Sequence, residues 1–61
     1  MHDEWTRKLP DGRMVRYTRE FKAGGYSRIT ATVGGQTKVL ELDGGATREE
    51  VEEHFEIAGL D

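Results

Sequence analysis

Cysteine is absent from this chain, proline occurs once, and no apolar run approaches the length needed to cross a bilayer. Without cysteine, neither a disulfide nor a thiolate metal site can form, and this absence suits a reducing compartment. The chain begins Met-His-Asp-Glu-Trp, which places acids where a signal peptide needs basic residues. We therefore expect a cytoplasmic protein with no membrane partner.

Short length and low apolar content limit the fold further. We take residues 1–61 as one small domain, because the chain is too short for a second. A chain of this size buries only about 60% of its unfolded surface, so its margin of stability is thin. Apolar residues make up 34% of the chain, but they recur periodically, which favours a folded domain over disorder.

Charge is distributed unevenly along the chain. Residues 1–30 contain seven Lys or Arg against four Asp or Glu, a net charge of +3. Residues 31–61 contain two against eight, a net charge of −6, and the whole chain carries −3. The basic half alternates as β-strands do, whereas the acidic half ends in a helical pattern. A basic sheet and an acidic helix indicate electrostatic recognition of a partner.

The first half of the chain has the pattern of a β-hairpin. Residues 9–13, Leu-Pro-Asp-Gly-Arg, combine a proline that presets φ with a glycine that tolerates positive φ. This chemistry is typical of a three-residue hairpin loop that ends in a glycine bulge. Counting outward from the loop pairs Trp5 with Tyr17 and predicts a hairpin over residues 3–21.

A second hairpin is predicted over residues 26–42. Residues 33–36, Val-Gly-Gly-Gln, place two glycines at the centre of a two-residue loop, where positive φ is needed. Counting outward pairs Ile29 with Leu40 and also brings together one Thr–Thr and one Arg–Glu pair. The link between the hairpins, residues 22–25, is short, so a four-stranded antiparallel meander is expected.

A helix is predicted over residues 48–58. Thr47 and Glu50 have the spacing of a capping box, in which the two side chains satisfy each other's backbone N–H groups. Gly59 and Leu60 suit a left-handed C-cap. Apolar residues recur between these ends at helical spacing, which predicts one narrow buried stripe. They are Val51, Phe55, Ile57 and Ala58.

The predicted fold class is α+β: a ββββα chain in which the C-terminal helix packs on one face of the meander. The same alternation places Arg7 and Arg19 on the core side, at the margin of the sheet and within reach of the helix glutamates. The predicted core consists of Trp5, Leu9, Val15, Tyr17, Phe21, Ile29, Ala31, Val33, Leu40, Leu42, Val51, Phe55, Ala58 and Leu60.

No pattern indicates catalysis, a metal or a cofactor. Glu50 and His54 share a helix side at i,i+4, but two ligands without cysteine make a poor zinc site. Ser27 has no base at a recognisable spacing, and the three glycine pairs match no phosphate-binding motif. We therefore expect a protein that is not an enzyme and that binds neither a metal nor a cofactor.

The leading functional interpretation is a small non-catalytic protein-binding module. Small acidic domains without cysteine include phage and mobile-element inhibitors, anti-CRISPR proteins among them, so an inhibitor function is expected on grounds of size and charge. The contact with a basic surface of the partner is predicted on an acidic helix face. Its residues are Glu49, Glu52, Glu53 and Glu56.

Two alternatives remain open. Lys8, Arg16 and Arg28 are predicted on the sheet face away from the helix, among threonines, where they would suit a phosphate backbone. Against nucleic-acid binding stand glutamates on the same face and a pI of about 5.3, where nucleic-acid binders usually lie above 9. The third interpretation is a structural homodimer that pairs exposed strand edges.

Overall fold

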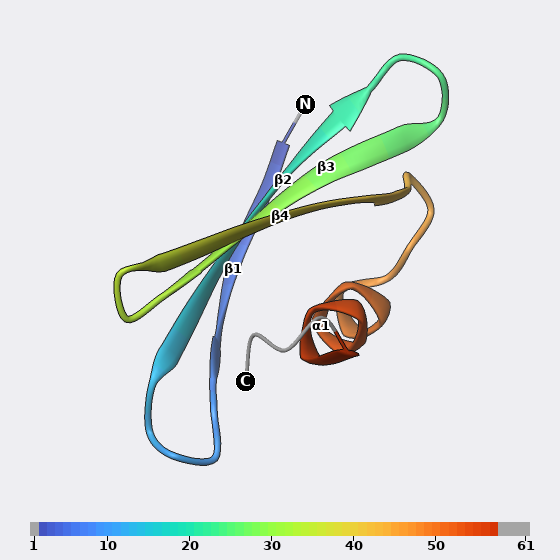
Figure 1. The fold of residues 1–61 in the computed structure, drawn as a ribbon. Coiled ribbons are helices and arrows are strands. Elements are labelled where there is room, and N and C mark those ends of the chain that lie inside the picture. Colours follow the sequence, from blue (N-terminus) through green and yellow to red (C-terminus); the bar gives the residue numbers. More distant parts are fainter. Residues whose placement is uncertain (1, 58–61) are drawn as a thin grey trace.

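Four antiparallel strands follow one another along the chain and a helix follows them, as Figure 1 shows. The computed structural model describes residues 2–57. The strands lie side by side in the order β1–β2–β3–β4, which is the predicted meander. The elements are β1 (His2–Lys8), β2 (Met14–Lys22), β3 (Tyr26–Val33), β4 (Gln36–Asp43) and α1 (Arg48–Ile57).

The first hairpin has the predicted loop and register. The N–H of Leu9 donates to the carbonyl of Arg13 at 2.7 Å, and the N–H of Gly12 donates to the carbonyl of Leu9 at 2.9 Å. Gly12 has a φ of 95°, a conformation that favours glycine. Trp5 lies opposite Tyr17, as predicted.

The second hairpin also agrees with the sequence pattern. Gly34 and Gly35 have φ values of 53° and 84°, so both central loop residues adopt the positive φ of a type I′ turn. Ile29 lies opposite Leu40, which confirms the predicted register. Strand β2 pairs directly with β3, so the two hairpins form one continuous sheet.

One face of the sheet, here called the inner face, carries the core and is covered by α1 (Figure 1). Tyr17 occupies its centre, stacked on Trp5 with ring centroids 5.1 Å apart and tilted against Phe55 at 5.7 Å. The predicted residues Trp5, Leu40 and Leu42 are only partly buried, and Ala46 joins them unexpectedly. The fully buried apolar residues are Leu9, Val15, Tyr17, Ile29, Ala31, Val33, Val51 and Phe55.

Phe21 was wrongly predicted in the core, because 39% of its surface is exposed. Arg48, the first residue of α1, binds Asp3, and Asp3 lies opposite Arg19 on β2. Phe21 is two residues further along β2, and therefore lies past the start of the helix that would have covered it.

Arg19 was wrongly predicted at the sheet margin. Only 4% of its surface is exposed, and its Nη1 donates to the carbonyl of Ala46 at 2.6 Å instead of to a helix glutamate. Its guanidinium lies 5.5 Å from the Trp5 ring and 5.2 Å from the Phe21 ring, within the range of cation–π attraction. The buried arginine thus connects β2 to the loop that leads into α1.

The capping box at the start of α1 is confirmed in both directions. The N–H of Thr47 donates to Oε1 of Glu50 at 3.0 Å, and the N–H of Glu50 donates to Oγ1 of Thr47 at 3.1 Å. The predicted helical residue Ala58 and the predicted C-cap residues Gly59 and Leu60 lie outside the described residues. Within residues 2–57, α1 is too short and too polar to cross a membrane.

Candidate functional site

Three polar pairs join the side of α1 that faces β1 to that strand. The helix residues are four apart, so they advance about 6 Å per step along the axis. The strand residues are two apart, which is about 6.6–6.8 Å per step. These spacings are close enough for three successive contacts between a strand and a helix. The pairs are Asp3–Arg48, Trp5–Glu52 and Arg7–Glu56.

The first pair is a bidentate ion pair at the start of the helix. Arg48 donates from Nη2 to Oδ1 of Asp3 at 2.6 Å and from Nε to Oδ2 at 3.0 Å. This hydrogen bonding lowers the pKa of the Asp3 carboxyl and raises the pKa of Arg48. The Arg48 guanidinium also lies 5.0 Å from the ring centroid of Trp5. The pair therefore holds the first turn of α1 against β1.

The other two pairs continue along the same side. The indole N–H of Trp5 donates to Oε2 of Glu52 at 2.9 Å, so the polar atom of a half-buried ring is satisfied. Arg7 donates from Nη2 to Oε1 of Glu56 at 2.8 Å, and its Nε lies 3.5 Å from Oε1 of Glu52. The hydrogen bond to Glu56 is the main reason that the pKa of Arg7 is raised. The prediction that Arg7 reaches the helix glutamates is confirmed.

The four glutamates of the predicted contact face therefore have two different environments. Glu52 and Glu56 are engaged by β1, as described above. Glu49 and Glu53 are exposed, and neither has a hydrogen-bonding or ion-pair partner within residues 2–57. They are four apart on the helix and therefore neighbours on its surface. Together, Glu49 and Glu53 are called the acidic ridge below.

The sheet face opposite α1, here called the outer face, carries the predicted basic residues, but two of the three are paired with acids. Arg16 donates to Oε2 of Glu4 at 2.8 Å, and Arg28 donates to Oε2 of Glu41 at 3.0 Å. Lys8 is exposed and has no ion pair among the described residues. The positive charge available to a phosphate backbone is thus smaller than the sequence suggested.

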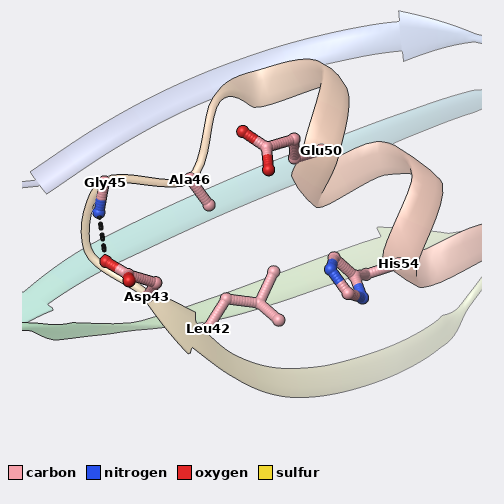
Figure 2. A pocket seen from close by; sticks show the side chains of 6 residues that line it. All are labelled: Leu42, Asp43, Gly45, Ala46, Glu50 and His54. Carbon is pink, nitrogen blue, oxygen red and sulfur yellow. Dashed lines mark hydrogen bonds between the residues drawn. The ribbon is translucent and has the colours of Figure 1, made fainter.

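A cleft of about 250 Å³ opens on the other side of α1, toward β4 (Figure 2). In Figure 2, the Leu42 side chain points from β4 toward the cleft, and the loop that carries Ala46 closes one end. Glu50 and His54 approach from the helix. The lining residues are Leu42, Asp43, Gly45, Ala46, Glu50 and His54.

The acids of this cleft are held by backbone groups. Oδ1 of Asp43 accepts a hydrogen bond from the N–H of Gly45 at 2.8 Å, and Oε1 of Glu50 accepts the capping-box bond. Glu50 and His54 are four apart, but no group of three or more metal-ligating side chains occurs within residues 2–57. Two ligands are fewer than the three or four that a zinc site takes from a protein.

Sequence reasoning did not predict the contacts of Asp3 with Arg48 and of Trp5 with Glu52, and it missed the cleft. A signal for the three polar pairs was present, because residues of opposite or complementary polarity recur at steps of two on β1 and four on α1. No signal for the cleft was present, because it depends on how far α1 lies from β4.

No match to the chain was found among protein-family models, curated proteins or solved structures.

Proposed function

We propose that this chain is a small non-catalytic protein-binding module whose acidic ridge contacts a basic surface of its partner. The ridge residues are Glu49 and Glu53, with Glu56 at the margin. The proposal takes the form of an inhibitor of the phage or mobile-element kind, in which a small acidic domain covers a basic, nucleic-acid-binding surface of another protein.

One observation carries this proposal: the sheet pairs its two exposed outer-face arginines with glutamates, whereas two neighbouring helix acids, Glu49 and Glu53, have neither a cation nor a hydrogen-bond donor among residues 2–57. Arg16 and Arg28 each lie within 3.0 Å of a glutamate oxygen on the same face. Glu49 and Glu53 lie side by side with no cation bound to either among residues 2–57. A partner cation relieves the repulsion between these two carboxylates, so binding there is favoured electrostatically.

The geometry also makes the ridge a firm surface. Val51 and Phe55 are fully buried on the opposite side of the helix, and the three polar pairs hold α1 to β1. The helix backbone beneath the ridge is therefore preorganised, and docking orders only the two glutamate side chains.

The test is affinity capture from lysate of the source organism with quantitative mass spectrometry. The bait is compared with a Glu49→Lys/Glu53→Lys variant and with a Glu4→Lys/Glu20→Lys variant, which changes the charge equally on the outer face. We expect a protein that is captured by the unaltered chain and by the outer-face variant but is lost with the ridge variant. With the purified partner, the affinity should fall as ionic strength rises.

Two results would contradict the proposal. One is a captured partner that the ridge variant retains while the outer-face variant loses it. The other is a gel shift with DNA or RNA that Arg16→Glu/Arg28→Glu abolishes, which would favour the nucleic-acid alternative. Even non-specific binders shift nucleic acid at about 10⁻⁴–10⁻⁶ M, so high micromolar protein is sufficient for this measurement.

A further inference from the structure

The cleft between β4 and α1 is of a size that suits one side chain rather than a small-molecule ligand. Its volume is about 250 Å³, below the roughly 300–1,000 Å³ of typical ligand pockets. Its apolar wall, Leu42 and Ala46, belongs to the partly buried margin of the core and is already shaped by packing. A long side chain with an aliphatic stem would cover this apolar wall.

The polar lining of the cleft consists of His54 and two carboxylates, Asp43 and Glu50, and the carboxylates are held in position. Backbone N–H groups hold Oδ1 of Asp43 and Oε1 of Glu50 at 2.8 and 3.0 Å. The second oxygen of each carboxylate, Oδ2 and Oε2, accepts no hydrogen bond within residues 2–57. No lysine or arginine lines the cleft. Two oriented acceptors with no lysine or arginine beside them match the chemistry of a basic group that has several donors.

We propose that this cleft receives a single basic side chain, arginine in preference to lysine, from the protein partner. The aliphatic stem lies along Leu42 and Ala46, and the guanidinium donates to the second oxygens of Asp43 and Glu50. Arginine is favoured because its five N–H donors can reach two separate carboxylates, whereas the lysine ammonium is one compact charge. This inference rests on the proposed function, since the acidic ridge and the cleft occupy adjacent sides of α1.

The cleft is tested directly by NMR titration of the ¹⁵N-labelled chain with Nα-acetyl-arginine N-methylamide. The citrulline counterpart, which has nearly the same shape without the charge, serves as the control ligand. We expect saturable shifts at the amides of Gly45, Ala46 and Glu50, with a dissociation constant on the order of 1 mM or weaker. The citrulline compound should give shifts at least tenfold smaller at the same concentration.

Two variants separate the cleft from the acidic ridge. Asp43→Asn/Glu50→Gln keeps an amide oxygen for each backbone hydrogen bond but removes two charges, and glutamine also serves in capping boxes. Glu49→Gln/Glu53→Gln removes two charges from the ridge. We expect the cleft variant to weaken arginine binding at least tenfold and the ridge variant to weaken it less than threefold.

Equal weakening by both variants, or equal shifts from the citrulline compound, would overturn the cleft inference. The proposed function is judged separately by partner capture. A partner lost by the ridge variant and retained by the cleft variant leaves the proposed function standing and removes the cleft from it. Saturable arginine binding in the cleft, without a partner that depends on the ridge, would support the cleft site and contradict the proposed function.

Discussion

The two long sides of α1 carry similar residues, but these residues differ in their hydrogen-bonding partners. On the side toward β1, Arg48, Glu52 and Glu56 each bind a strand residue. On the side toward β4, Glu50 is bonded only to the helix cap, and His54 has no hydrogen bond within residues 2–57. Glutamates a few positions apart on one helix thus divide into those that hold the fold together and those available to a partner.

The inward side chains of the two edge strands explain this difference. Strand β1 turns an acid, an indole N–H and a guanidinium toward α1, and all three find a complementary group. Strand β4 turns Lys38, Leu40 and Leu42 toward the same face, but the residues nearest the cleft, Leu40 and Leu42, offer no hydrogen bond. The helix is therefore fastened along β1 by polar pairs, while a cleft remains between it and β4.

Replacing Phe55 by alanine should loosen α1 from both edge strands, and we expect it to lower the free energy of unfolding more than any other substitution considered. Phe55 is fully buried against Tyr17, and truncation of a buried phenylalanine costs about 3–5 kcal/mol. A domain of this size has little more stability than that, so we expect a largely unfolded chain in urea titrations followed by circular dichroism. Glu53→Ala is the control on the exposed side. A loss below about 1 kcal/mol for Phe55→Ala would mean that α1 is not anchored through this ring.

The second prediction compares neighbouring glutamates directly. Glu52→Ala should lower the free energy of unfolding by about 1–3 kcal/mol, because the half-buried indole N–H of Trp5 loses its acceptor. Glu53→Ala should change the free energy of unfolding by no more than about 0.5 kcal/mol. Glu52→Gln should fall between them, because an amide oxygen still accepts from Trp5. Equal effects of the two alanine variants in urea unfolding would contradict the distinction between the two environments.

The same residues show which parts of the fold could be predicted from the sequence. Both hairpin registers were predictable because each loop has its own turn chemistry, and a slip of one residue would expose Ile29 and Leu40. The capping box was predictable because it is local. The burial of Arg19 and the exposure of Phe21 were not, because both depend on where the helix begins above β2. That position is set by contacts such as Trp5–Glu52, between residues 47 apart in the chain.

The candidate site was predictable only in part, for the same reason. The helical pattern identified the four glutamates, but it did not show which of them β1 engages. Periodicity places a residue on a helix face, whereas its partner depends on the lateral position of the whole helix. The cleft beside β4 results from the lateral position of α1, and no pattern in residues 42–46 predicts it.

The third prediction concerns acid, and it tests the Asp3–Arg48 pair. The hydrogen bond from Arg48 lowers the pKa of Asp3 in the folded state below the unfolded value of about 3.9. The folded state therefore binds fewer protons in this range. The stabilisation from the pair is present above the unfolded pKa and is lost as pH falls through the folded pKa. Asp3→Asn should flatten the decline of the free energy of unfolding below about pH 5, measured by urea titration at each pH.

Asp11 provides the comparison for that experiment, because its pKa is also lowered, chiefly by the backbone N–H of Arg13. Asp11→Asn should remove its own share of the acid dependence without releasing α1 from β1. An Asp3→Asn variant with the same pH profile as the unaltered chain would show that the ion pair does not contribute to stability.

The smallest expected change in the free energy of unfolding comes from neutralising one residue of the acidic ridge, Glu53 or Glu49. Glu53→Gln relieves repulsion from Glu49 and should raise the free energy of unfolding by about 0.2–0.5 kcal/mol, equivalent to roughly 1–4 °C in Tm for this size. Glu49→Gln relieves the same repulsion, but it removes a negative charge from the first turn of α1, where the helix dipole favours acids. These opposing terms should leave its Tm nearly unchanged.

Thermal melts at low salt measure both variants, and the gain from Glu53→Gln should shrink at high salt because the relieved repulsion is screened. A loss of stability on Glu53→Gln would mean that Glu53 has a cationic partner, and the ridge would then not be free to bind one.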